Sequence, residues 1–167
     1  ASDVYKRQIH RASGRRRAGG PATARIDVKR PIVVVEPKTH RRLRVIDALR
    51  GTHAIQPLDA IDGALRHIRE HRPPIVLIGI GRRTDPALRL ARQIRTDGST
   101  PGLIGLIDWK HRLADPAAVA SACGAAGILR GTPEPDALRE FVAQLRAGSP
   151  LVMGDPPPRR WPRWRTR

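Results

Sequence analysis

The chain has 167 residues, which is enough for one domain with a hydrophobic core. No apolar run reaches the roughly 18 residues that a membrane-spanning helix needs, and the first thirty residues lack the apolar stretch of a signal peptide. The single cysteine, Cys123, excludes an intrachain disulfide and a cysteine metal cluster. We therefore expect a cytoplasmic protein that does not associate with membranes.

The net charge of +17 is concentrated at the two ends of the chain. Residues 1–30 carry +7 and residues 156–167 carry +5, so residues 31–155 carry only +5. Residues 1–8, which include DVYKRQ, resemble the translation of a sequencing adaptor, and we interpret them as an artefact outside the fold. Residues 9–30 are predicted to be a disordered basic segment, and residues 149–167 a linker or tail rich in proline and arginine. The alternative is that both ends are native disordered tails.

Between these ends, residues 31–148 alternate short apolar runs with segments of helical spacing. The apolar runs predict buried strands, because they are rich in β-branched residues and bounded by turn-forming residues. A weaker second run is expected at a sheet edge. The predicted strands are Ile32–Val35, His53–Leu58, Ile75–Ile80, Leu103–Ile107 and Gly127–Leu129.

Five helices are predicted to follow these strands, each with an N-terminal signal. Thr39 is expected to cap the first, with Leu43, Ile46 and Leu49 on its inner face, and Asp59 or Asp62 the second, which buries Leu65 and Ile68. The pairs Asp85-Pro86, Asp115-Pro116 and Thr132-Pro133 predict the starts of the other three. The expected inner faces of the third and fifth helices are Leu88, Ala91 and Ile94, and Leu138, Phe141, Val142 and Leu145.

This alternation predicts an α/β fold, because parallel strands need crossover connections and these are nearly always right-handed. The expected architecture is a three-layer α/β/α sandwich around a five-stranded parallel sheet of order 2-1-3-4-5. In such a sheet the functional site lies at the carboxyl ends of the strands. Gly79 stands near the end of the third strand, where it offers no reactive side chain.

The loop Gly79–Thr84 reads GIGRRT and lies between a predicted strand and a predicted helix. A nucleotide-binding loop has this position, and Arg82 and Arg83 would favour an anionic ligand. However, Thr84 replaces the third glycine of the dinucleotide fingerprint, and this unit is not the first of the sheet. An ordinary connecting loop is the favoured interpretation, with nucleotide binding as a weaker alternative.

Two other groups invite a chemical interpretation. His67 and His71 lie four residues apart on a predicted helix, but two imidazoles without a third ligand make a poor metal site. Cys123 lies in a small apolar helix, and burial is favoured over reactivity because no histidine is placed nearby in the sequence. We therefore predict no bound metal and no cofactor.

Several segments resemble response-regulator receiver domains, whose fold is flavodoxin-like. HRPPIVLIGIGRRTDPALRLARQIR resembles their third strand and helix, and SACGAAGILRGTPEPDALREFV resembles their last strand and helix. TPGLIGLI resembles the fourth strand, and IVVVEPKTHRRLR the first strand and its turn. The likeness covers about residues 31–146 in the right order.

The resemblance implies a site at which an aspartate accepts a phosphoryl group. In that family an acidic pair holds Mg²⁺, an aspartate ending the third strand accepts the phosphoryl group, and a hydroxyl and a lysine contact it. Here the acidic pair falls on Val35 and Glu36, so that only Glu36 remains as a cation ligand. The acceptor falls on Gly79, the hydroxyl on Leu106 or Ile107, and the lysine on Gly131. The resemblance therefore implies a degenerate receiver that cannot be phosphorylated.

We thus expect a signalling module of a two-component or transcription-regulatory pathway, outside the phosphorelay chemistry and without enzymatic activity. In the family the usual partner surface is formed by the fourth helix, fifth strand and fifth helix. The resemblance places this surface at about residues 117–145, for a protein partner or a homodimer.

A second hypothesis is a nucleic-acid-associated protein that binds through its basic flanking segments. The arginine clusters could contact phosphates, and Trp161 and Trp164 could stack on bases. Such binding would be non-specific and strongly dependent on salt. The candidate residues are Arg15, Arg16, Arg17, Arg159 and Arg160.

Overall fold

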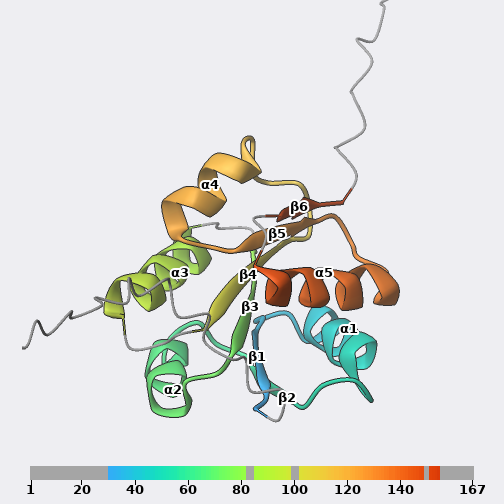
Figure 1. Ribbon diagram of the computed structural model, residues 1–167, viewed down its shortest axis with the longest axis horizontal. Coiled ribbons are helices and arrows are strands. Elements are labelled where there is room, and N and C mark those ends of the chain that lie inside the picture. The colour runs from blue at the N-terminus through green and yellow to red at the C-terminus, as the bar shows by residue number, and fades with distance from the viewer. Residues whose placement is uncertain (1–29, 82–84, 99–101, 149–150, 155–167) are drawn as a thin grey trace, which may run out of the picture.

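A computed structural model describes residues 30–81, 85–98, 102–148 and 151–154. They form one parallel sheet with helices on both faces, which confirms the predicted three-layer sandwich (Figure 1). The sheet has six strands in the order β2-β1-β3-β4-β5-β6, so the predicted order holds but the predicted count of five is wrong. The elements are β1 Ile32–Val35, α1 Thr39–Leu49, β2 Ile55–Leu58, α2 Ala64–His71, β3 Ile75–Gly79, α3 Asp85–Asp97, β4 Leu103–Asp108, α4 Pro116–Cys123, β5 Gly127–Arg130, α5 Pro135–Ala147 and β6 Leu151–Met153.

The additional strand β6 lies in the segment predicted as a linker or tail. Helix α5 ends at Gly148 with φ of 78°, and β6 then pairs in parallel with β5, from Gly127 opposite Leu151 to Leu129 opposite Met153. Without β6 the outer edge of β5 would present unpaired backbone groups. A run of only three apolar residues is too short to reveal this pairing in the sequence.

Strands β1, β3 and β4 contribute side chains to two hydrophobic cores, one on each face of the sheet. Every residue of β1 and β3 is buried, and successive side chains alternate between the two faces of the sheet. Val33 and Val35 pack on one face, and Ile32 and Val34 on the other. Strand β2 lies at the edge, as predicted, and its partly exposed sequence includes Pro57, a residue suited to edge strands.

Helices α2, α3 and α4 cover one face of the sheet, whereas α1 and α5 cover the other (Figure 1). The predicted inner faces of α3 and α5 are confirmed, because all seven of their named side chains are buried. In α2, Ile68 is buried and Leu65 is partly buried. Cys123 is buried, as expected for a packing residue.

The predicted inner face of α1 is wrong in part. Leu43 is 50% exposed, whereas Val45, Ala48 and Leu49 are buried. The spacing of three that joins Leu43 to Leu49 drifts around a helix of 3.6 residues per turn. Val45, Ala48 and Leu49 are spaced i, i+3 and i+4, which places their side chains on one face of the helix, and this face packs on the sheet.

One predicted cap is confirmed, because Asp115 accepts a hydrogen bond from the Ala118 N–H at 3.0 Å. The caps predicted for α1, α2 and α5 are wrong. Thr39 is the first residue of α1 rather than its cap, and α5 begins at Pro135, after Glu134, instead of at Thr132-Pro133. A proline fits the first turn of a helix, so either Thr-Pro or Glu-Pro could have served.

The cap of α2 is Gly63, not Asp59 or Asp62. Gly63 has φ of 86°, in the left-handed region that an aspartate adopts only at a cost. The turn before α2 therefore selects the glycine over the neighbouring acids.

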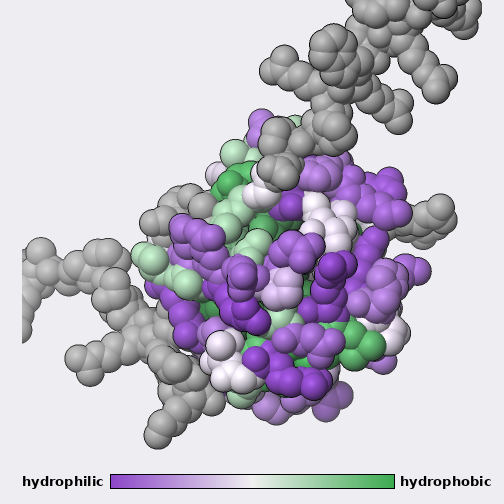
Figure 2. All heavy atoms as spheres, turned by 90° about the vertical axis from the view of Figure 1, so that its right-hand side faces the viewer, coloured by the Kyte–Doolittle hydropathy of each residue, from purple (hydrophilic) through white to green (hydrophobic). Residues whose placement is uncertain are grey.

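None of the helices in the described ranges is both long and apolar enough to cross a membrane. The face that carries α1 and α5 is mostly hydrophilic, with small separate apolar areas (Figure 2).

Candidate functional site

The carboxyl ends of β1, β3, β4 and β5 lie side by side at one edge of the sheet. The strand register places Val35 beside Ile78, Gly79 beside Ile107, and Asp108 beside Arg130. The sequence-predicted positions Val35, Glu36, Gly79, Ile107 and Gly131 are thus brought to this one edge. Their side chains, however, form a packed floor rather than a reactive site.

The Glu36 carboxylate occupies the space above Gly79. A Cβ atom on Gly79 would lie 1.9 Å from Glu36 Oε2 and 3.2 Å from Trp109 Nε1. Glu36 is only 2% exposed, and its Oε1 accepts a hydrogen bond from the Lys38 N–H at 2.8 Å. The position predicted for a phosphoacceptor therefore has no room for a side chain unless Glu36 moves.

Two polar atoms close to Gly79 are buried without a hydrogen-bond partner among the described residues. They are Glu36 Oε2 and Trp109 Nε1, which both lie near the position of the missing Cβ. The backbone of Glu36 is held firmly, since its N–H donates to Leu58 O and its carbonyl accepts from Arg42 Nη1. Glu36 is thus fixed at the sheet edge, and Gly79 makes room for its carboxylate.

The predicted hydroxyl position is apolar in either register. Leu106 and Ile107 are both fully or almost fully buried, on opposite faces of the sheet. Val35 is buried in the core on the same face as Leu106. These three side chains pack in the two cores and supply neither a donor nor a metal ligand.

At Gly131, the position predicted for the lysine, the ring of His111 lies next to the place where a side chain would begin. Gly131 has φ of 85°, and a Cβ there would lie 3.2 Å from His111 Nε2. His111 itself has φ of 49°, and its Nδ1 is buried without a partner among the described residues. A lysine at 131 would therefore meet both backbone strain and the imidazole ring.

Asp108 is a buried acid that the sequence pattern does not single out, because the predicted fourth strand ends at Ile107 and the observed strand ends at Asp108. It is fully buried and accepts hydrogen bonds from the Arg112 N–H at 2.8 Å and the Leu113 N–H at 3.0 Å. Arg130 Nε lies 4.0 Å from its Oδ2, and Arg130 Nη2 donates to Leu113 O. Asp108 therefore shapes the loop after β4. An acid directly after the apolar run LIGLI was the available signal.

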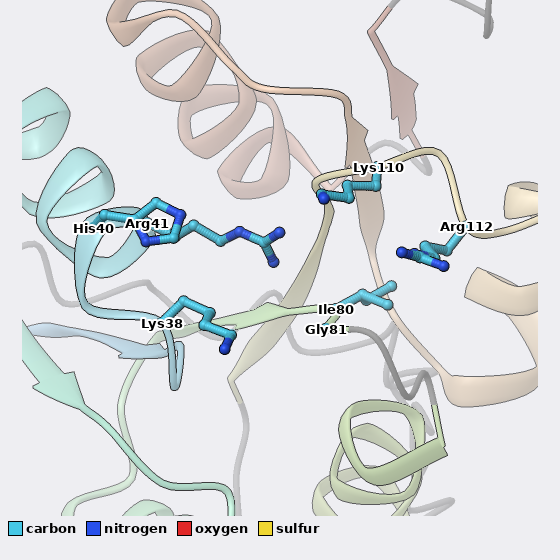
Figure 3. A pocket seen from close by; sticks show the side chains of 7 residues that line it. All are labelled: Lys38, His40, Arg41, Ile80, Gly81, Lys110 and Arg112. Carbon is cyan, nitrogen blue, oxygen red and sulfur yellow. The ribbon is translucent and has the colours of Figure 1, made fainter.

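Above this floor lies a hollow that we name the basic pocket. Its volume is about 380 Å³, and Figure 3 shows its side chains around a common space. Lys38 and Arg41 come from the β1–α1 side, and Lys110 and Arg112 from the loop after β4. The complete lining is Lys38, His40, Arg41, Ile80, Gly81, Lys110 and Arg112.

The basic pocket has no acidic side chain in its lining. Within the described ranges, none of its four permanent cations forms an ion pair with a carboxylate. The sequence signals are the segments KTHRR and WKHR, each within three residues of the end of a predicted strand. They lie some seventy residues apart, so that only the sheet register brings them together.

A second, smaller hollow adjoins the basic pocket and shares His40, Arg41 and Lys110 with it. Its lining also includes Trp109, and the Arg41 guanidinium carbon lies 5.3 Å from the centre of the Trp109 ring. A guanidinium over an aromatic face is attracted to it. This contact favours one orientation of Arg41, which lines both hollows.

The predicted partner surface at residues 117–145 is formed by α4, β5 and α5, but β6 modifies it. Strand β6 covers the outer edge of β5 and contacts both α4 and α5. The exposed strand at this surface is therefore β6, whose Val152 is 44% exposed.

Those remaining predicted residues that the structure describes form no further site. The rings of His67 and His71 stack with centroids 4.1 Å apart, and the pKa of His67 is lowered by burial and by His71. Within the described ranges no three metal-ligating side chains come together. Arg15, Arg16, Arg17, Arg159 and Arg160 lie outside the described residues, as do Arg82, Arg83 and Thr84 of the glycine-containing loop.

No family model matches the sequence, and comparison with curated proteins gave no significant match. Solved structures do match. The chemotaxis protein CheY4 of Vibrio cholerae has a TM-score of 0.62 at 14% identity, covering 70% of this chain and 98% of its own.

The receiver domain of the putative regulator NarL from Mycobacterium tuberculosis has a TM-score of 0.61 at 24% identity, covering 73% and 99%. The receiver domain of Ssk1 from Saccharomyces cerevisiae, solved with the histidine phosphotransfer protein Ypd1, has a TM-score of 0.61 at 16% identity, covering 71% and 90%. The chain therefore has the fold of response-regulator receiver domains.

Proposed function

We propose that this chain is a degenerate receiver-like signalling module that acts in the cytoplasm by binding other proteins, without aspartyl phosphorylation and without enzymatic activity. Its place would be a two-component or transcription-regulatory pathway. The observation that carries the proposal is the pairing of Gly79 with Glu36. The space of an acceptor side chain is filled by a neighbouring carboxylate.

The chemistry of phosphoryl transfer to a carboxylate supports this proposal. The reaction needs a nucleophile, a hard cation held by oxygen ligands, and donors for the charge that develops. Gly79 supplies no nucleophile, and Leu106 and Ile107 supply no hydroxyl. Glu36 is the single acid at the expected metal position. One such loss could be compensated, but without a nucleophile at position 79 the phosphoryl group has no acceptor there.

The outer surface of α4 supports protein binding. This helix, PAAVASAC, has no charged residue, although Ala117, Ala118, Ser121 and Ala122 are exposed. An exposed helix without charges is unusual on a surface that contacts only water. Beside it lies β6 with its exposed Val152, so that α4 and β6 form one weakly polar surface. Ssk1 supports the class, because its receiver domain was solved with a partner protein.

The first experiment is incubation with acetyl phosphate and Mg²⁺, followed by intact-mass measurement, with an active receiver domain treated in parallel. We expect the active domain to gain the mass of one phosphoryl group and this chain to gain none. A stable phosphoryl adduct on this chain would overturn the proposal.

The second experiment tests the α4–β6 surface. Ala118→Arg with Ala122→Arg places two charges on α4, whereas Gln93→Arg with Thr96→Arg adds the same charge to exposed positions of α3. If the surface makes a homodimer, sedimentation should show self-association that the α4 variant loses and the α3 variant keeps. Equal effects of both variants would show that the contact depends on charge alone.

A further inference from the structure

We propose that the basic pocket binds a small anion that carries two or more phosphate charges, held without a covalent bond. This inference concerns a ligand and does not depend on the proposed signalling role. It rests on the charge of the lining, its arrangement around the hollow, and the way one of its arginines is held.

The charge of the lining is the first argument. Lys38, Arg41, Lys110 and Arg112 are four permanent cations around one hollow, and no acid lines it. Like charges at close range repel each other, and a low-dielectric floor strengthens this effect. Ile80, which lines the hollow, is 1% exposed, so part of that floor is apolar. A multiply charged anion would offset the repulsion among these four cations.

The arrangement of the cations is the second argument. One pair comes from the start of α1 and the other from the loop after β4, so that donors face the hollow from two sides (Figure 3). The tetrahedral oxygens of a phosphate accept hydrogen bonds from several directions, and arginine forks match them well. The volume of about 380 Å³ is in the range of small-molecule sites. These features favour the binding of a small phosphate-bearing ligand over the binding of a macromolecule with a flat surface.

Preorganisation is the third argument. The Arg41 guanidinium is held over the Trp109 ring at 5.3 Å, and Trp109 is itself 5% exposed. A charged side chain that is already positioned loses less conformational freedom when a ligand binds.

The test is titration of the full chain with pyrophosphate, with citrate and inorganic phosphate as comparison anions at matched ionic strength. Binding is followed by NMR shifts of the Ile80, Gly81 and Lys110 amides and by thermal unfolding. The variant Lys110→Gln/Arg112→Gln removes two pocket charges. The control Arg89→Gln/Arg92→Gln removes two exposed charges of α3.

We expect pyrophosphate to shift the three amides and, at a hundredfold excess over its Kd, to raise Tm by on the order of 10 °C. The pocket variant should weaken binding at least about tenfold, whereas the α3 control should bind like the unchanged chain. Equal binding by both variants would assign the anion to the basic ends and overturn the proposal. Absence of shifts at the three amides, or citrate binding as tightly as pyrophosphate, would overturn it as well.

Discussion

The fit between Gly79 and Glu36 makes a quantitative prediction about stability. Gly79→Ala adds one methyl group at a point 1.9 Å from Glu36 Oε2. Gly79 does not have a positive φ, so the alanine brings no backbone strain. The substitution must instead displace the buried carboxylate or distort the loop that bonds it to the Lys38 N–H.

Inserting an atom group into packed space costs typically about 1–3 kcal/mol, and we expect a loss in this range for Gly79→Ala. In a Glu36→Ala background the obstructing carboxylate is gone. There the same substitution should cost less than about 0.5 kcal/mol, since alanine is also less disordered than glycine in the unfolded chain. The expected coupling between the two positions is therefore about 1–3 kcal/mol.

The assay is urea unfolding of the unchanged chain, both single variants and the double variant, followed by circular dichroism. Gly81→Ala is the control, because a Cβ at that nearby position meets no atom within 4 Å. Gly79→Ala costing the same with and without Glu36 would refute the reasoning. So would an equal loss in the Gly81 control, because the cost would then not come from the carboxylate.

Three further predictions concern other parts of the chain. Asp108→Ala should lower the free energy of unfolding by about 2–4 kcal/mol, since two backbone N–H groups lose a charged acceptor, whereas exposed Asp47→Ala should cost far less in the same urea assay. The pKa of His53 is lowered by burial and, to a smaller extent, by Arg146. The unfolded chain therefore protonates His53 more readily than the folded chain, so the free energy of unfolding should fall as the pH drops below the usual histidine pKa. NMR titration should show the pKa of His53 rising in Arg146→Gln, and an unchanged pKa would contradict that cause. Finally, a chain trimmed to residues 30–154 should lose most of any affinity for DNA in a salt titration, because the excess charge lies in the flanks; retained affinity would place binding on the domain.

The α/β architecture could be predicted because local patterns determine it. Apolar β-branched runs are suited to strands buried on both faces, and strands that alternate with helices need right-handed crossovers. The predicted order 2-1-3-4-5 is a common order of doubly wound parallel sheets. Strand β6 could not be predicted, because three residues carry no periodicity and its partner edge exists only in the folded sheet.

The residue types at the candidate site could be read from the sequence. Gly79 and Gly131 carry no side chain in any conformation, and the resemblance to receiver domains is what places them at the acceptor and lysine positions. What replaces those groups was not predictable. Glu36 fills the space above Gly79 and His111 the space beside Gly131, and both placements depend on loops that the sequence pattern does not describe.

The sequence by itself therefore determined the class of fold and most of the core faces, since these depend on residue type and short-range spacing. Only the tertiary structure shows that four basic side chains of the domain surround one pocket. Lys38 and Arg41 follow β1, whereas Lys110 and Arg112 follow β4, and these two segments meet because β1, β3 and β4 are neighbours in the sheet. Parallel pairing aligns the carboxyl ends of distant strands, and that alignment turns two separate basic segments into one pocket.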